Sequence, residues 1–404
     1  MKIVLITTGQ PSCNPRIVKE ADCLSNAGYD VTVVYSFFID WAQENDELLL
    51  KNALWKYKMV GGDGAENKLL FFFTRLRFKV NQVLYKYVGN KFLFAERAQA
   101  RAYDELLRAA KKIKADWYIG HNLGALPIAV QAAKYNNAKS GFDFEDYHRA
   151  EVDSVNKSLF NRIVFLENKY IPFLKYISVS SDLILEEVRK DHLNFKYNFI
   201  CLYNSFPLKQ LPKVTRVKHD KESKLNLFWF SQTIGLSRGL EIVLEALKLI
   251  NDKNIHLTLA GRFDDSFKNY LKHNAISLKK NIHLAGIISS HHLPSFSSNF
   301  DIGLAVELPN PYNRDICLTN KIFTYLLAGN AIIFSATNAQ EKFNSEYKAG
   351  FVYQQENISD LANCILLFKD NILLENQKRH NRELAETIFN WELESKKLLQ
   401  LLIS

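Results

Sequence analysis

The sequence predicts an α/β protein with two Rossmann-like domains. Short apolar runs without alternation, typical of buried parallel strands, recur along the chain with helical patterns between them. This alternation stops in a charged, proline-containing segment and then starts again. The length of 404 residues and the hydrophobic content of 47% are enough for two cores. A doubly wound sheet in each half explains all three observations.

The first half contains five expected strands, at residues 2–7, 30–36, 116–121, 140–144 and 176–180. Between the first two, Asn14 is placed to cap a helix that has Pro15 at its first position and Gly28 after its end. Helical patterns at 123–135 and 166–175 continue the repeat. The first half therefore repeats one strand–helix unit.

The strand–helix unit repeats again after residues 205–224. This segment holds two prolines, many charges and no consistent apolar period. We place the domain boundary there, with domains at 1–204 and 205–384. Strands are expected at 225–230, 256–260, 281–285, 301–306 and 331–335, and helices at 240–250 and 320–327. Residues 382–402 show a helical period, so a C-terminal helix, 385–404, is expected to cross back and complete the first domain.

Composition limits the possible functions. The 52 Lys and Arg against 43 Asp and Glu give a net charge of +9, which favours an anionic partner. The five cysteines are scattered and never form a C-x-x-C pair, so neither a disulfide framework nor a zinc cluster is indicated, and a reducing cytoplasm fits best. The apolar run at the N-terminus is too short for a signal peptide. No run reaches the roughly 18 apolar residues of a membrane span.

Ligands of open α/β sheets bind beyond the carboxyl ends of the strands, and two facing sheets predict an interdomain cleft. The first such loop, TTGQPSC, lacks the G-x-G-x-x-G pattern of nicotinamide dehydrogenases. Gly9 allows a tight turn there, and the helix capped by Asn14 directs free N–H groups toward the cleft, with Arg16 nearby. The loop is therefore able to hold an anion, although an ordinary capped helix is the simpler interpretation of it.

Two basic residues at helix starts in the second half form a better anion site. Arg238-Gly239 opens the helix after the strand at 225–230, and Lys321 stands at the matching position in TNKIFTYLLAG. A cation beside a helix N-terminus suits a diphosphate. Either residue alone is more often a solvated surface charge, but two on neighbouring loops of one sheet favour a diphosphate site.

These segments resemble the retaining GT-B glycosyltransferases of family four, which are glycosyltransferase group 1-like enzymes. NPRIVKEADCLSNAGYDVTVVY is similar to the opening segment of that family, SQTIGLSRGLEIVLEAL to its G-x-x-x-x-K/R-G loop, and TNKIFTYLLAG to its N-K-[LI]-F-E-Y-x-x-x-G helix. FNWELE is similar to the terminal helix that crosses back to the first domain. The resemblance covers nearly the whole chain and implies a GT-B fold, a nucleotide-sugar donor and retention of configuration.

The resemblance also implies individual roles. Arg238 and Lys321 would bind the donor diphosphate and act catalytically by stabilising the leaving group. The chain has no D-x-D motif, which is consistent with a site that uses neither metal nor cofactor. Gly261 and Arg262 would lie beside the nucleotide base. The other donor-binding residues that we expect are Gly9, Gln232, Thr233, Asn320 and Thr324.

The chain departs from the family in two places. The E-x7-E pattern would require glutamates where Ile316 and Thr324 stand, and Glu307 is a candidate replacement as a donor contact. After the strand at 140–144 the family has D-x-H-E, whereas this chain reads DFEDYH, with Glu145 in place of the histidine. We expect Glu145 to be catalytic. The expected acceptor-binding residues are Asn14, Arg16, His121, Asp143 and Asp146, although Asp143 could instead cap the turn.

Positive charge is concentrated between residues 68 and 101, which hold eight Lys or Arg and one acid, Glu96, and so supply +7 of the net +9. Aromatic residues are interleaved with these charges, as in an interfacial amphipathic segment, and an anionic membrane is the natural partner. A helical hairpin with solvated lysines explains the pattern equally well. Nucleic acid is not expected, because no RNA-binding signature accompanies the aromatics.

We therefore expect a cytoplasmic transferase of the hexosyltransferase type, acting in bacterial surface polysaccharide or glycolipid assembly. Its acceptor would be a glycan or a lipid-linked molecule, and a peripheral position on the inner face of the cytoplasmic membrane would fit the basic segment. Two alternatives remain. The missing carboxylates suggest an inactive nucleotide-sugar-binding homologue, and a nonhydrolysing sugar epimerase has a similar architecture.

Overall fold

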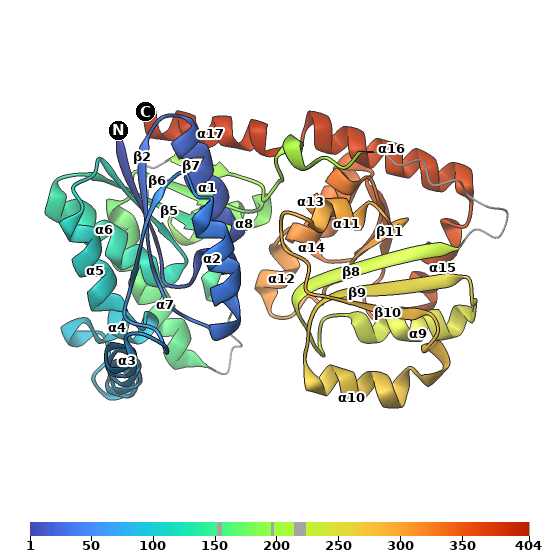
Figure 1. Ribbon diagram of the computed structural model, residues 1–404, viewed down its shortest axis with the longest axis horizontal. Coiled ribbons are helices and arrows are strands. Elements are labelled where there is room, and N and C mark those ends of the chain that lie inside the picture. Colours follow the sequence, from blue (N-terminus) through green and yellow to red (C-terminus); the bar gives the residue numbers. More distant parts are fainter. Residues whose placement is uncertain (152–155, 195–197, 214–223, 404) are drawn as a thin grey trace. The chain divides into compact units, whose positions relative to one another are not determined.

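The computed structural model describes residues 1–151, 156–194, 198–213 and 224–403. The chain forms two compact units, one of Met1–Leu202 with Lys397–Ser404 and one of Tyr203–Lys396. Each unit contains one parallel sheet with helices around it (Figure 1). Residues 214–223, in the middle of the expected connector, lie outside the described residues.

The sheet of unit 1 has seven parallel strands in the order β3-β2-β1-β4-β5-β6-β7. They are β1 (Lys2–Thr7), β2 (Asp30–Ser36), β3 (Lys56–Val60), β4 (Trp117–His121), β5 (Lys139–Phe144), β6 (Tyr176–Val179) and β7 (Asn198–Cys201). The five predicted strands are confirmed. Strand order reverses between β1 and β4, so the loops after these strands border the position where such sheets bind ligands.

The helices of unit 1 are α1 (Pro15–Asn26), α2 (Gln43–Lys51), α3 (Lys68–Val88), α4 (Phe94–Gln99), α5 (Tyr103–Lys112), α6 (Leu126–Asn136), α7 (Lys157–Tyr170) and α8 (Asp182–Asp191). The predicted cap of α1 is confirmed, because the Asn14 side chain accepts hydrogen bonds from the N–H groups of Arg16 and Ile17. The helix predicted at 166–175 was misplaced. It begins earlier and ends at Tyr170, and Pro172 lies in the short 3-10 turn that follows.

The sheet of unit 2 has six parallel strands in the order β10-β9-β8-β11-β12-β13. They are β8 (Leu225–Ile234), β9 (Ile255–Phe263), β10 (Ile282–Gly286), β11 (Ile302–Ala305), β12 (Ala331–Ser335) and β13 (Gly350–Tyr353). The helices are α9 (Leu240–Ile250), α10 (Asp265–Asn274), α11 (Leu293–Ser297), α12 (Tyr312–Ile316), α13 (Asn320–Ala328), α14 (Asn338–Tyr347), α15 (Ile358–Leu367) and α16 (Asn371–Thr387). Strands β8 and β9 extend four and three residues beyond their predicted ends.

A glycine in β11 sets how closely α13 packs on this sheet. A Cβ atom at Gly303 would lie 2.2 Å from the ring of Tyr325. The Tyr325 hydroxyl donates to the carbonyl oxygens of Phe228 and Leu304, at 3.1 and 3.3 Å. The absence of a side chain at Gly303 therefore lets α13, with Lys321 in its first turn, lie directly against β8 and β11.

The C-terminal segment forms two helices rather than the single one predicted. Asn390 separates α16 from α17 (Trp391–Ile403), because its amide nitrogen donates to the carbonyl oxygens of Ala385 and Glu386 while its amide oxygen caps Leu393 N–H. Leu401 and Leu402 of α17 belong to the core of unit 1. The last helix thus starts in unit 2 and ends in unit 1. Among the described residues, no helix is both long and apolar enough to cross a membrane.

Candidate active site

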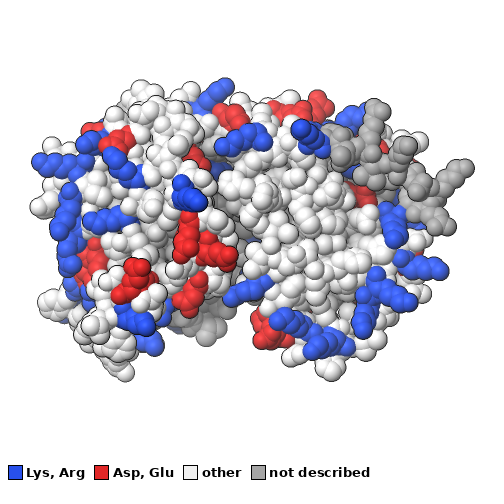
Figure 2. All heavy atoms as spheres, in the orientation of Figure 1, with Lys and Arg blue, Asp and Glu red and all other residues white. Residues whose placement is uncertain are grey.

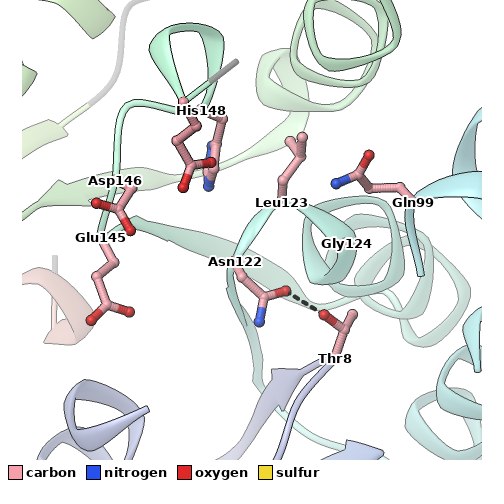
Figure 3. Close-up of a pocket in the computed structure, with 9 residues that line it drawn as sticks. Thr8, Gln99, Asn122, Leu123, Gly124, Glu145, Asp146 and His148 are labelled. Atoms are coloured by element: carbon pink, nitrogen blue, oxygen red, sulfur yellow. Dashed lines mark hydrogen bonds between the residues drawn. The ribbon is translucent and has the colours of Figure 1, made fainter. Parts of the chain in front are cut away.

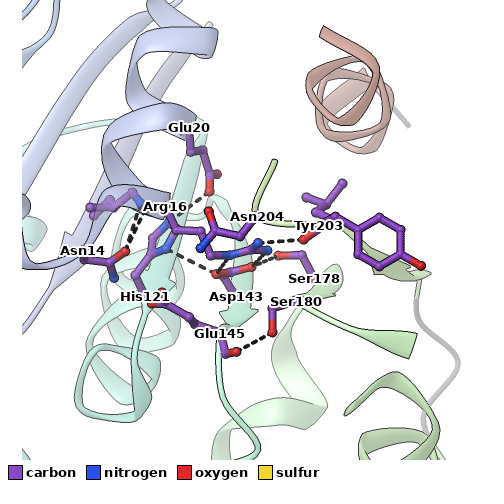
Figure 4. Close-up of polar contacts among 12 residues, drawn as sticks. Asn14, Arg16, Glu20, His121, Asp143, Glu145, Ser178, Ser180, Tyr203 and Asn204 are labelled. Atoms are coloured by element: carbon purple, nitrogen blue, oxygen red, sulfur yellow. Dashed lines mark hydrogen bonds and ion pairs between the residues drawn. The ribbon is translucent and has the colours of Figure 1, made fainter. Parts of the chain in front are cut away.

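A buried ionic network lies at the carboxyl edge of the sheet of unit 1 (Figure 4). Arg16 of α1 binds Asp143 of β5 in a bidentate pair, with N···O distances of 2.6 and 2.7 Å. The same guanidinium donates to the carbonyl oxygen of Leu202 at 2.6 Å, and the Ser178 hydroxyl donates to Asp143 at 2.6 Å. Such charge-assisted, bidentate contacts hold the end of β5 rigidly.

His121, the last residue of β4, joins this network. Its Nε2 lies 3.0 Å from Glu20 Oε2 and its Nδ1 lies 3.6 Å from Asp143 Oδ2. Burial alone would lower the pKa of His121, but Glu20 and Asp143 raise it to about 9, so the imidazolium form is favoured at neutral pH. Burial opposes ionisation of Asp143 as well, yet Arg16 and His121 hold its pKa far below the usual range.

The structure thus brings together three predicted acceptor-binding residues, Arg16, His121 and Asp143, and buries all of them. None is more than 4% exposed. Their contact with an acceptor stays a prediction, since in this structure their side chains pair with one another and with Glu20. Asn14 is also buried, and its side chain is engaged in the cap of α1.

A cavity of about 170 Å³ lies where β1, β4 and β5 end (Figure 3). Its lining residues are Thr8, Gln99, Asn122, Leu123, Gly124, Glu145, Asp146, His148 and Glu151. Two predicted site residues, Glu145 and Asp146, are among them. The Thr8 hydroxyl donates to Asn122 Oδ1 at 2.8 Å, and Asn122 Nδ2 donates to the Thr7 hydroxyl at 2.9 Å. These contacts tie the loops after β1 and β4 into one wall.

The cavity is acidic, since three carboxylates line it and its lining includes neither Lys nor Arg. Burial, followed by the neighbouring charge of Asp146, raises the pKa of Glu145 to about 7. Burial also raises the pKa of Glu151, and the neighbouring charge of His148 partly offsets this rise. A carboxyl group with a pKa near neutrality can accept or release a proton under physiological conditions. The cavity therefore suits a ligand rich in hydroxyl groups.

Sequence reasoning missed several residues of this edge. Thr8, Asn122, His148 and Glu151 all follow predicted strands, so the rule that selected Glu145 would have found them. Glu20 carried no such signal, because it lies within a helix and meets His121 only through the fold.

The carboxyl edge of the sheet of unit 2 brings the Lys321 side chain and the turn that carries Arg238 to the same residue, Glu307. Lys321 forms an ion pair with Glu307, and both side chains are buried. A Cβ atom at Gly239 would lie 3.5 Å from Val306 Cβ and 3.8 Å from Glu307 N, so the turn of Arg238 packs against the same strand end. Arg238 itself is half-buried. The turn of Arg238 and the first turn of α13 thus meet around Glu307.

The loop that carries Arg238 is held from two sides. The N–H of Ser237 donates to Glu241 Oε1 at 2.6 Å, and Arg314 Nη1 donates to the Ser237 carbonyl oxygen at 3.0 Å. Arg314 is a further basic residue at this edge that the sequence did not single out. It lies in the middle of the five-residue helix α12, which follows β11.

The remaining predicted donor residues are divided among different environments. Thr233 and Arg262 face each other in the register of β8 and β9, and Gln232 next to them is exposed. They are therefore strand residues rather than loop residues. Gly261 has φ = 143°, and a Cβ atom there would lie 2.0 Å from Ser231 O, so only glycine fits.

Thr324, which was expected at the ribose, is fully buried, and its hydroxyl donates to Asn320 O at 3.0 Å. It offers no surface to a ligand in this structure. Asn320 accepts a hydrogen bond from the Asn204 amide through its side chain. Gly9 belongs to unit 1, where it is half-buried in the loop after β1. Within the described residues, no group of three or more His, Cys, Asp or Glu is arranged to hold a metal ion.

Comparison with known proteins yields matches among solved structures alone, since no family model and no curated protein matches. Anabaena HepE in complex with UDP has a TM-score of 0.71 at 13% identity, covering 100% of this chain and 99% of that one. Sucrose-phosphate synthase from Thermosynechococcus elongatus has a TM-score of 0.72 at 14% identity, covering 99% and 98%. WaaG, a glycosyltransferase involved in lipopolysaccharide biosynthesis, has a TM-score of 0.65 at 12% identity, covering 98% of each chain. The chain therefore has the GT-B fold, as predicted.

Proposed function

We propose that this chain is a glycosyltransferase that moves a hexosyl group from a nucleotide-diphosphate sugar to an acceptor hydroxyl. The observation that carries the proposal is the meeting of the Arg238 turn with Lys321 at the carboxyl edge of the sheet of unit 2. Structural neighbours support it, because HepE has been solved with UDP and with UDP-glucose and WaaG is named a glycosyltransferase.

In this reaction the bond between the anomeric carbon and the diphosphate oxygen breaks, and negative charge develops on the leaving group. Arg238 and Lys321 would stabilise that charge, aided by the N-terminus of α13. The acceptor oxygen forms the new bond, and we propose that configuration is retained. Glu307 holds Lys321 in place and would accept a hydrogen bond from the donor.

These fixed cations supply the positive charge that a metal ion would otherwise provide, so we propose that the reaction needs no metal and no cofactor. Activity that survives treatment with EDTA would agree with this proposal. Activity that EDTA removes and magnesium or manganese restores would contradict it.

For the acceptor we propose a glycan or a lipid-linked molecule bound at the acidic cavity of unit 1. Glu145 would accept the hydrogen bond or the proton of the attacking hydroxyl, and Asp146 would bind a second hydroxyl. Assembly of a surface polysaccharide or glycolipid at the cytoplasmic face of a membrane is the setting that we propose for this reaction.

The donor site can be tested by isothermal titration with UDP. We expect Arg238→Ala and Lys321→Ala each to weaken binding by about 1.5–3 kcal/mol, the usual contribution of a charged hydrogen bond. Glu307→Gln should lower the free energy of unfolding by about 3–5 kcal/mol, because it leaves the charge of Lys321 buried without its partner. Lys280→Ala, at an exposed position, is the control. Unchanged UDP affinity in both alanine variants would refute the proposed site.

Product analysis separates the alternatives. A transferase forms a new glycoside, and the anomeric configuration of the product tests retention. An inactive homologue, which the missing E-x7-E carboxylates would suggest, binds the donor without transfer or hydrolysis. An epimerase changes the sugar in the absence of any acceptor.

A further inference from the structure

Helix α3 turns a mixed polar and aromatic side toward the rest of unit 1, where Phe71 packs on Phe37, and turns an apolar side outward. Thr74, Asn81 and Tyr85 are 3%, 5% and 6% exposed, and at 100° per residue they fall on one side of the helix. The Thr74 hydroxyl donates to the Gly61 carbonyl oxygen at 3.1 Å. The opposite side carries seven large apolar residues that are 45% to 84% exposed: Leu69, Phe72, Phe73, Leu76, Val80, Val83 and Tyr87.

We call these seven residues the apolar stripe of α3. A helix on the surface of a soluble domain normally presents charged and polar residues to solvent, so an exposed apolar side of this length is unusual. At 1.5 Å per residue the stripe is roughly 27 Å long. Figure 2, in which α3 is seen end-on at the lower edge of unit 1, shows that end drawn largely in white, the colour of all residues other than Lys, Arg, Asp and Glu. An exposed apolar area of this extent marks an interaction site.

A row of basic residues runs along one flank of the stripe. Lys68, Arg75, Lys79 and Lys86 lie within about 40° of one another around the helix, and α3 contains no acidic residue. Arg77 is not part of this row, because it forms ion pairs with Asp104 and Glu105. Arg97, which lies after α3 in the basic segment, is also paired with Asp104. The charge available for a partner is therefore smaller than the sequence total of +7.

We propose that α3 docks in the interface of an anionic membrane, with the apolar stripe at the acyl-chain boundary and the basic row on the headgroups. Charge complementarity selects this occupant, since a single convex helix with an apolar stripe and cations on its flank matches an interfacial helix. Of the basic row, Lys68, Lys79 and Lys86 are exposed and so can reach lipid phosphates, whereas the half-buried Arg75 guanidinium lies 3.6 Å from the centre of the Phe71 ring. This inference goes beyond the proposed sugar transfer and does not depend on it.

The first experiment removes the apolar stripe. Leu69, Leu76 and Val83 are replaced by Ser in the full chain, and sedimentation with vesicles of phosphatidylcholine and phosphatidylglycerol is measured. We expect binding to fall at least 100-fold, because each side chain loses its apolar contact with the membrane. The same replacement at Leu48 and Leu193, which are 63% and 82% exposed elsewhere in unit 1, is the matched control and should leave binding unchanged.

The second experiment reverses the charge of the basic row. A basic residue at an anionic surface contributes about fivefold to binding, so Lys68→Glu, Lys79→Glu and Lys86→Glu together should reduce it by at least roughly 100-fold. High salt should weaken wild-type binding, and vesicles of phosphatidylcholine alone should bind less. Lys112→Glu and Lys114→Glu, at exposed positions outside α3, are the control.

Three outcomes would overturn the proposal: equal binding of the wild type to neutral and anionic vesicles, binding that survives both sets of changes, and a stable dimer in solution that the serine variant dissociates. The last outcome would assign the stripe to a second copy of the chain. All replaced residues are exposed, so circular dichroism and thermal unfolding should match the wild type. These folding measurements and the UDP titration keep a failure of membrane docking distinct from a failure of the proposed reaction.

Discussion

Replacing His121 by Gln should remove a pH-dependent part of the stability of unit 1. The side chain is 1% exposed and lies between Glu20 and Asp143, which raise its pKa from 6.5 to about 9. Between about pH 6.5 and pH 9, His121 keeps its proton in the folded state and has lost it in the unfolded state. Stability from this proton is therefore fully present below about pH 6.5 and is lost as the pH rises through 9.

The magnitude follows from the shift. One pKa unit corresponds to about 1.4 kcal/mol, so the shift of His121 is equivalent to about 3 kcal/mol. Glu145, with a pKa of about 7, titrates within the same range of pH, so the wild type alone does not isolate His121. The useful quantity is the difference between wild type and His121→Gln, which should be about 3 kcal/mol larger at pH 6 than at pH 10.

Urea unfolding read by pulsed hydrogen exchange gives this difference for unit 1 alone. Peptides from β1 and β4 report on the sheet that holds His121, whereas whole-chain probes would mix the two units. His273→Gln, an exposed position in unit 2, is the control and should not change these peptides. The stability difference between wild type and His121→Gln could instead stay constant from pH 6 to pH 10, within roughly 0.5 kcal/mol, the limit of such measurements. That result would refute the assignment of an imidazolium to His121.

Three further predictions concern packing and catalysis. Gly303→Ala should lower the free energy of unfolding by about 3 kcal/mol or more, because its Cβ would meet a buried tyrosine ring at 2.2 Å, whereas Gly9→Ala has open space and should change thermal unfolding little. Leu401→Ala should destabilise unit 1 by about 2–4 kcal/mol, measured by hydrogen exchange of β1. Ile403→Ala, at a 75% exposed position, should leave this exchange unchanged. The transfer rate should rise as the pH passes through about 7 where Glu145 ionises, and Glu145→Gln should flatten this pH profile.

Most of the strands that could be predicted are buried on both faces, although the edge strand β10 was also predicted. Strands β1 and β2 match their predicted bounds to the residue, because each has a run of apolar residues and most of its side chains are buried. Strand β3 was missed, since it is an edge strand in which Lys56 and Lys58 alternate with exposed residues, and this pattern is not distinctive. The break at Asn390 was missed because the apolar period continues across it.

The candidate site was predictable where a residue follows a strand, and not where it depends on a distant partner. Arg238, Lys321 and Glu145 were found by their place at strand or helix ends. The burial of Arg16 by its pair with Asp143 depends on residues 127 positions apart, which no local pattern reveals. Composition likewise identified an amphipathic basic segment at 68–101 but not which side of it faces outward.

The division of unit 1 between the two ends of the chain has a consequence for folding during synthesis. Its sheet is complete by Leu202, yet Leu401 and Leu402 join the core with Ile3 and Leu5 only after unit 2 has been made. At typical rates of translation that interval is about 10–40 s. During it the first unit lacks part of its core and leaves apolar surface open, which makes it a natural client for a chaperone. A permuted gene that encodes residues 391–403 ahead of residue 1 should shorten that exposure.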